Sequence, residues 1–110
     1  MSEFRDHIPL VRQAQQGSPE ARGDLLRIVE PRLAEYVGRL TLQADLTADI
    51  VQESIAEMLD ILDTLKDPQR FWCWLYTIAL NKVRGHYRRR GRHRERPLPD
   101  AGMDWLEARE

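Results

Sequence analysis

One stretch of this 110-residue chain, residues 68–90, carries side chains whose types and spacing suit chemistry. When successive residues are turned by about 100°, as in an α-helix, polar and aromatic side chains recur on one face. They are Arg70, Trp74, Thr77, Asn81, Arg84 and Arg88. Such a face offers cations to phosphates, an aromatic plane to a base, and an amide to a base edge. The pattern indicates nucleic-acid binding, although Trp74 could instead cover a neighbouring helix and Asn81 could be a solvated helix residue.

A run of arginines overlaps the end of this face. It consists of Arg88, Arg89, Arg90, Arg92, Arg94 and Arg96. Basic runs also occur as processing sites, targeting signals, RNA-binding arms and solvated linkers, so the run alone is not specific. The near-exclusive use of arginine over lysine favours phosphate recognition, because a guanidinium group can bind two oxygens at once.

The net charge of −1 conceals an uneven distribution along the chain. Residues 1–67 contain 7 basic and 13 acidic side chains, residues 68–96 contain 9 and 1, and residues 97–110 contain 1 and 4. A basic segment of this kind attracts phosphates. The acidic segment before it indicates either a second, basic partner or a balancing of charge within the molecule.

Catalysis has little support in the sequence. There is no glycine-rich phosphate loop, no Ser or Cys nucleophile with a His at a recognisable spacing, and no convergence of carboxylates from separate elements. The single Cys73 excludes an internal disulfide and is expected to be an inert packing thiol. Together with His7, His86 and His93 it shows no spacing typical of metal ligands. We predict a protein that is not an enzyme and has no metal, cofactor or small-molecule substrate.

The composition, 42% hydrophobic and 32% charged, is typical of a soluble globular domain. The longest uncharged, apolar-rich stretch, residues 71–81, is about half as long as a membrane span requires. Residues 1–6 contain no apolar targeting core. We therefore predict a cytoplasmic protein without membrane association.

Every periodic stretch favours helix, and no run alternates for long enough to form a strand, which predicts an all-α fold. The expected architecture is a compact bundle of about four helices, at about 3–16, 19–41, 45–65 and 68–90. Gly17 ends the first helix and Ser18 caps the second. Because Pro31 removes a backbone donor, the second helix is expected to be kinked or split there, into segments of about 19–29 and 31–41.

The third predicted helix begins at Asp45 or Thr47 as its cap. Opposite its apolar side, a polar stripe without any lysine recurs at steps of three and four. Its members are Asp49, Gln52, Glu53, Glu57 and Asp60. Such a stripe is either a solvated face or an interface, and the pattern alone leaves both open.

The fourth predicted helix is capped by Asp67 and opened by Pro68. Phe71 and Ile78 are expected at the flank of its apolar face. The predicted core residues of this helix are Trp72, Leu75, Tyr76, Ala79, Leu80, Val83 and Tyr87.

Two segments of the chain resemble conserved region 2 of bacterial RNA polymerase sigma factors, above all the compact extracytoplasmic-function (ECF) group. The first is Asp49-Ile-Val-Gln-Glu-Ser-Ile, and the second is Phe71-Trp-Cys-Trp-Leu-Tyr-Thr-Ile-Ala-Leu-Asn-Lys-Val-Arg with its arginine-rich end. The stretch from Leu10 to Ala21 and the segment at Pro31 match the opening helices of that group. The resemblance therefore covers about residues 8–96.

This resemblance implies a domain of the sigma region 2 type at residues 1–96 that binds core RNA polymerase. The acidic third helix matches the element that docks on the clamp helices, a coiled coil in the largest polymerase subunit. The implied polymerase-binding residues are Asp49, Gln52, Glu53 and Glu57.

The resemblance also implies recognition and melting of the promoter −10 element. Asn81 occupies the position at which the family reads a base flipped from the non-template strand. The implied DNA-binding residues are Arg70, Trp74, Thr77, Asn81, Arg84, Arg88, Arg89 and Arg90. The loop at residues 63–69 matches the specificity loop of the family, with site residues Thr64, Leu65, Lys66 and Asp67.

Sigma factors of this group normally carry a second helical domain that reads the −35 element, and no segment after Pro97 is long enough to form it. The chain is therefore either a fragment or a protein that works without that domain, and we expect a fragment whose residues 97–110 are an acidic tail at the start of an interdomain linker. The resemblance also implies regulation by an anti-sigma protein. Two alternatives remain open: a small helical RNA-binding protein that uses its arginine-rich arm, and a protein–protein adaptor.

Overall fold

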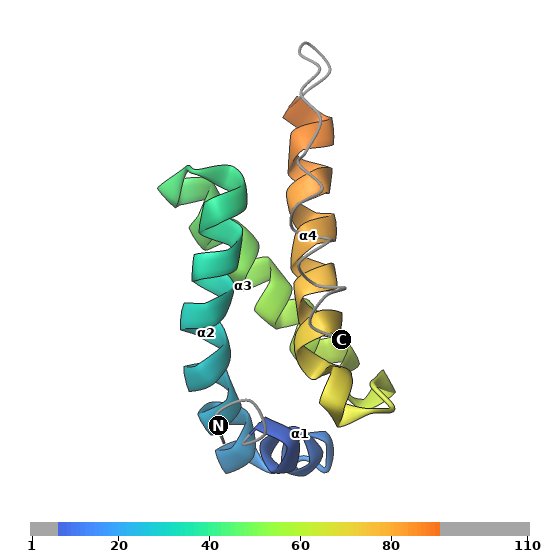
Figure 1. Cartoon of the computed structure of the whole chain (residues 1–110). Helices are drawn as coiled ribbons and strands as arrows, with labels where there is room; N and C mark the ends of the chain where they lie inside the picture. Colours follow the sequence, from blue (N-terminus) through green and yellow to red (C-terminus); the bar gives the residue numbers. More distant parts are fainter. Residues whose placement is uncertain (1–6, 91–110) are drawn as a thin grey trace.

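The computed structural model describes residues 7–90, and these form helices alone (Figure 1). Their order is α1 (His7–Gln15), α2 (Pro19–Thr41), α3 (Ala44–Ile61), the short 3-10 turns η2 (Leu62–Thr64) and η3 (Pro68–Arg70), and α4 (Phe71–Arg90). α2 packs against each of the other three helices, and α1 lies across its first turns. The predicted all-α bundle of about four helices is confirmed.

Several predictions from the sequence fall on residues beyond this range. The start of the first helix before residue 7, the arginines after Arg90 and the tail at 97–110 lie outside the described residues. Within residues 7–90, none of the helices combines the length and the apolar character that crossing a membrane requires.

The turn between α1 and α2 follows from local sequence. Gly17 adopts a φ of 96°, in the left-handed region that a residue without a Cβ enters at little cost. The Ser18 hydroxyl then accepts a hydrogen bond from the backbone N–H of Ala21 at 3.1 Å, and Pro19 occupies the first helical position. The predicted stop and cap are both confirmed.

α2 runs without interruption through Pro31, so the predicted division into two segments is wrong. A proline inside a helix removes one hydrogen bond and costs about 3 kcal/mol. On either side of it, Val29 and Leu33 are fully buried in one core, and burial of such side chains contributes about 1.5–3 kcal/mol each. Packing of both halves of α2 against the same core therefore outweighs the local loss.

The end of α2 contains an unusual residue, Leu42, at a φ of 56°. Its backbone N–H donates to the carbonyl oxygen of Gly38 at 2.9 Å, which closes the helix. The left-handed conformation costs a residue with a Cβ roughly 1–2 kcal/mol. The Leu42 side chain is nevertheless 84% exposed, so no packing within the described bundle compensates for that cost.

α3 begins at Ala44, so neither Asp45 nor Thr47 caps it and that prediction is wrong. Both residues lie inside the first turn. The Thr47 hydroxyl lies 2.7 Å from the Thr41 hydroxyl, which accepts from the backbone N–H of Gln43 at 3.1 Å. A side chain of α2 therefore satisfies the donor at the start of α3, a contact that no local pattern reveals.

The connection from α3 to α4 is longer than expected and contains the two short 3-10 turns η2 and η3. α3 ends at Ile61, before the predicted residue 65, and α4 begins at Phe71 after a short turn at 68–70. Asp67 caps that turn by accepting from the backbone N–H of Gln69 at 3.0 Å. Gln15 of α1 reaches across and donates to the carbonyl oxygens of Leu62 at 3.0 Å and Leu65 at 2.7 Å.

The core lies where α2, α3 and α4 meet. Its largest fully buried side chains are Phe71, Leu25, Leu33, Ile50, Met58, Leu62, Leu75, Leu80, Val11, Val29, Val37 and Val83. The predicted apolar face of α4 is buried except for half-buried Tyr87. Phe71 and Ile78, expected at the flank, are buried as well. α4 packs against both α2 and α3, and two neighbours require a wider apolar stripe than one.

Candidate nucleic-acid interface

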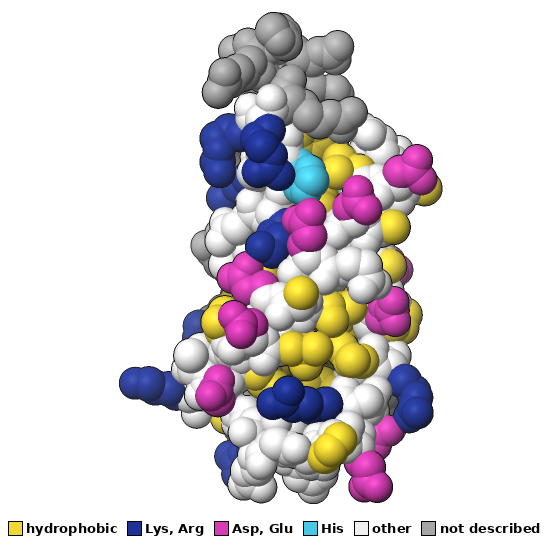
Figure 2. Space-filling model, turned by 180° about the vertical axis from the view of Figure 1, so that it is seen from behind, with side chains coloured by type: hydrophobic (Ala, Val, Ile, Leu, Met, Phe, Trp, Pro, Cys, Tyr) yellow, Lys and Arg dark blue, Asp and Glu magenta, His cyan; other side chains and the backbone are white. Residues whose placement is uncertain are grey.

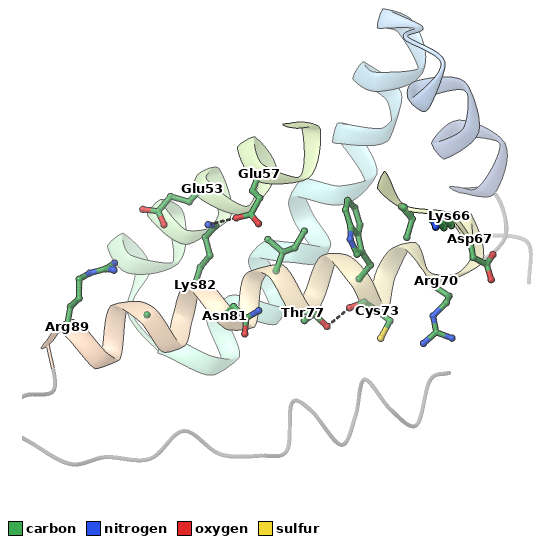
Figure 3. Close-up of a pocket in the computed structure, with 14 residues that line it drawn as sticks. Glu53, Glu57, Lys66, Asp67, Arg70, Cys73, Thr77, Asn81, Lys82 and Arg89 are labelled. Carbon is green, nitrogen blue, oxygen red and sulfur yellow. Dashed lines mark hydrogen bonds and ion pairs between the residues drawn. The ribbon is translucent and has the colours of Figure 1, made fainter. Parts of the chain in front are cut away.

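A hollow of about 730 Å³ runs along α4 beside the end of α3, and we call it the α3–α4 groove. Three elements line it (Figure 3). α3 contributes Glu53 and Glu57, the connection before α4 contributes Leu65, Lys66, Asp67 and Arg70, and α4 contributes Cys73, Trp74, Thr77, Ile78, Asn81, Lys82, Gly85 and Arg89.

The α3–α4 groove brings together five of the eight predicted DNA-binding residues. They are Arg70, Trp74, Thr77, Asn81 and Arg89. Asn81, Arg70 and Arg89 are exposed, whereas Trp74 and Thr77 are half-buried. The Thr77 hydroxyl donates to the carbonyl oxygen of Cys73 at 2.8 Å, so its proton is engaged within the helix. The predicted combination of cations, ring and amide is therefore present in one place.

The other predicted arginines lie elsewhere. Arg84 and Arg88 do not line the α3–α4 groove, and the side chain of Arg90 lies outside the described part. Arg84 lies towards α2, close enough to affect Tyr36. Burial raises the pKa of the Tyr36 phenol to about 12, the neighbouring Tyr76 adds to this, and the Arg84 guanidinium opposes it. The face of α4 that lines the groove therefore lies closer to α3 than the face predicted from the sequence.

Three of the four predicted specificity-loop residues line the α3–α4 groove, namely Leu65, Lys66 and Asp67. Lys66 and Asp67 are exposed at its end, and half-buried Leu65 packs against the core. Thr64 does not line it, and its hydroxyl donates to the carbonyl oxygen of Ile61 at 2.6 Å. The two hydrogen bonds from Gln15 hold the carbonyl oxygens of Leu62, just before this segment, and of Leu65 within it, so α1 contacts the segment where it enters the groove.

Sequence reasoning missed the groove residues that depend on the position of α3. Lys82 Nζ lies 2.6 Å from Glu57 Oε1, and His86 Nε2 lies 3.4 Å from Glu53 Oε1. These contacts join α4 to α3, and Figure 3 shows the Lys82 side chain directed at Glu57. Pairs of this exposure contribute about 0–1 kcal/mol to stability. The i, i+4 spacing of residues 74, 78 and 82 could have indicated that Lys82 shares a face of α4 with Trp74.

Trp74 both packs against the core and lines the groove, so its position does not decide between the two interpretations that the sequence left open. Its ring lies 6.0 Å from that of Phe71 and packs against the core. Its other side lines the α3–α4 groove. A ring held in this way loses little freedom when a base stacks on it.

Figure 2 shows one cluster of lysine and arginine side chains, near the end of α4, with a histidine beside it. Elsewhere on this face acidic and basic side chains are interspersed. Within residues 7–90, no three His, Cys, Asp or Glu side chains come together as metal ligands would. The groove therefore offers cations at its ends and carboxylates along its α3 side.

A second hollow, of about 500 Å³, lies between α2 and α3, and we call it the α2–α3 hollow. Small side chains leave the space open, and the exposed Leu42 stands at its end. Gln52 donates to the Glu30 carboxylate at 3.3 Å across it. The full lining is Glu30, Ala34, Gly38, Leu42, Gln43, Ala44, Thr47, Ala48, Val51 and Gln52.

The structure divides the four predicted polymerase-binding residues among three places. Gln52 lines the α2–α3 hollow, whereas Glu53 and Glu57 line the α3–α4 groove. Asp49 is exposed on α3 and lines neither. The acidic stripe therefore borders both hollows.

Residues 25–93 match the sequence profile of the family described as Sigma-70 region 2. The chain belongs to the Sigma-70 region 2 family. The resemblance seen in the sequence is confirmed, and the match includes every residue that lines the α3–α4 groove and the α2–α3 hollow. No solved structure matches this region 2 chain at a significant level.

Curated relatives of this region 2 chain carry the name "ECF RNA polymerase sigma-E factor". Those of Salmonella typhimurium (strain LT2) and Escherichia coli (strain K12) are each 32% identical to it over 108 residues, covering 98% of this chain and 54% of the relative. That of Haemophilus influenzae is 29% identical over 92 residues, covering 84% of this chain and 48% of the relative. The chain spans about half the length of the curated relatives it matches.

Proposed function

We propose that this domain binds core RNA polymerase, and recognises and melts the promoter −10 element in transcription initiation. The observation that carries the proposal is the α3–α4 groove, which combines a stacking ring, an amide and cations. Its partner is the non-template single strand. No covalent step of its own is needed, because the domain acts by binding. Such binding takes place where polymerase and promoter meet, which we expect to be the cytoplasm.

The proposed mechanism is capture of an unstacked base. Stacking on Trp74 is worth about 1–3 kcal/mol per base, which is comparable with the few kcal/mol needed to take a base out of the duplex. Lys66, Arg70 and Arg89 at the ends of the groove attract the phosphates on either side. Asn81 is exposed and carries both a donor and an acceptor for a base edge. Binding energy therefore favours the open strand over the duplex.

We place the polymerase contact on the α2–α3 hollow, which Gln52 lines, together with the exposed Asp49. Ala34, Gly38 and Ala48 allow a partner backbone to approach closely, and Leu42 offers an exposed apolar contact. Leu42 also holds a strained backbone, and strain of this kind concentrates at functional sites. The clamp helices of the largest polymerase subunit are the proposed occupant. Regulation by an anti-sigma protein stays a prediction.

The test of base capture compares two single-stranded DNA probes. One, the enriched strand, is selected from a random pool by its binding to the wild-type chain, and the other has the same bases in scrambled order. Asn81→Ala should reduce the preference for the enriched strand by roughly tenfold, because one base-edge contact is worth about 1–3 kcal/mol. Fluorescence titration at fixed salt measures both strands. Gln69→Ala removes an exposed amide that does not line the groove, so the preference should remain.

Equal binding of the enriched and scrambled strands by the wild-type chain would contradict base reading. The alternative of an RNA-binding arm predicts two other results. Deletion of residues 88–96 would abolish affinity for the strands, and substitution of Trp74 or Asn81 would not change that affinity. Residues 91–96 of that arm lie outside the described residues.

A further inference from the structure

The α3–α4 groove contains a carboxylate that attraction of phosphates does not explain. Glu57 lines the same hollow as Leu65, Trp74 and Ile78, the side chains best suited to contact a base. Its charge repels a phosphate, so its presence weakens the non-specific part of strand binding. A carboxylate in this place contributes to binding only where it meets a hydrogen-bond donor.

The structure holds Glu57 in a defined position. Its Oε1 lies 2.6 Å from Lys82 Nζ, and the two side chains are 42% and 26% exposed. A carboxylate has two oxygens and about four acceptor positions, so one ion pair leaves most of its accepting capacity unused. The ion pair also keeps Glu57 in place beside the captured base. In addition, it neutralises the Lys82 ammonium group, which would otherwise face the base edge.

We infer that Glu57 is a specificity-determining residue of the α3–α4 groove, and that it accepts a hydrogen bond from the exocyclic amino group of the captured base. The inference rests on the proposed capture of a single strand. Carboxylates accept from the N4 amino group of cytosine. Thymine has no exocyclic amino group, and its ring N–H lies between two carbonyl oxygens that a carboxylate repels. The groove therefore favours an amino-bearing base over thymine.

This role separates Glu57 from the polymerase-binding set in which the sequence placed it. Gln52 lies on the opposite side of α3, in the α2–α3 hollow. Glu53, although also in the α3–α4 groove, pairs with His86 at 3.4 Å and lies nearer the end of α4. Glu57 lines the groove together with Leu65 and Trp74. In Figure 3 its side chain lies between those of Glu53 and the loop residue Lys66.

The test compares the affinities of the full 110-residue chain for fluorescein-labelled oligo(dC) and oligo(dT) of equal length at neutral pH and fixed salt. The two strands have the same charge and similar base size, so they differ mainly in the base edge. The wild-type chain should bind oligo(dC) roughly tenfold more tightly. Glu57→Gln should bring this ratio close to one, because an amide can donate to thymine as well as accept from cytosine.

Asp60→Asn is the matched control. It removes the same charge from an exposed position of α3 that does not line the groove, so the preference for oligo(dC) should persist. Far-UV circular dichroism checks that both variants keep their helices. Three results would overturn the inference and leave strand capture standing. The wild-type chain could bind oligo(dC) and oligo(dT) equally well, Glu57→Gln could keep the wild-type preference for oligo(dC), or Asp60→Asn could lose that preference as Glu57→Gln does. Binding of neither strand would overturn the proposed strand capture as well.

Discussion

The two hollows beside α3 differ in what they offer a partner. The α3–α4 groove has a ring, an amide and cations at its ends, whereas the α2–α3 hollow is lined largely by small and apolar side chains. Gln52 and Glu53 are neighbours in the chain but belong to different hollows, because one residue turns an α-helix by about 100°. α3 thus separates a surface suited to nucleic acid from a surface suited to a protein helix.

The largest effect is expected from filling the α2–α3 hollow. Ala48→Arg fills it with a long side chain and should lower capture of core RNA polymerase roughly 100-fold, because overfilling a close contact costs about 1–3 kcal/mol. Titration of immobilised chain with polymerase measures this. Gln16→Arg adds the same charge in an exposed turn away from α3 and should leave capture unchanged.

The same Ala48→Arg variant tests whether the two hollows are independent. Its affinity for a single strand should equal that of the wild-type chain, since Ala48 does not line the α3–α4 groove. A parallel loss of strand binding and polymerase capture would show that the two surfaces act as one, against the division proposed here.

A smaller effect, on strand affinity, is expected when a side chain is removed from the α3–α4 groove. Trp74→Ala should weaken single-strand binding roughly tenfold to a hundredfold by removing the stacking plane. Trp74→Phe keeps a ring in that place and should retain most of the affinity. Polymerase capture should be unaffected in both variants. Fluorescence anisotropy with a labelled strand gives the comparison, and equal losses for Ala and Phe would exclude stacking.

The smallest effect concerns the loop that closes one end of the groove. Gln15→Leu removes the side-chain donor from both carbonyls, although that of Leu62 still accepts from the backbone N–H of Leu65, and should lower the free energy of unfolding by about 1–2 kcal/mol. Strand affinity should fall a few-fold as Lys66 loses its position. Gln16→Leu, at the exposed neighbouring position, should change stability by less than about 0.5 kcal/mol.

Urea unfolding measures both variants. If Gln15→Leu and Gln16→Leu were equally stable and bound strands equally well, α1 would not position the groove. The α2–α3 hollow serves as an internal reference, because Gln15 does not line it and polymerase capture should remain intact.

Features of the fold that depend on adjacent residues could be predicted. Gly17, Ser18 and Asp67 act through their own backbone conformation or through donors two or three residues away. The structure confirms Gly17 and Ser18, whereas Asp67 caps the short turn at 68–70 that precedes α4 and not α4 itself. Errors arose where a distant contact decided the outcome. Pro31 stays within one helix because both halves of α2 pack on one core, and Thr47 bonds to Thr41 instead of capping α3.

The candidate site shows the same division. Helical periodicity was enough to place Trp74 and Asn81 on one side of α4, because that periodicity is a property of the chain itself. Whether Arg84, Lys82 and Glu57 line the groove depended on where α3 lies against α4. The hydrogen bonds from Gln15 of α1 to the loop likewise join residues far apart in the chain. Local spacing sets which side chains share a face. Only packing between helices, which joins residues far apart in the chain, decides which faces meet and which remain open to a partner.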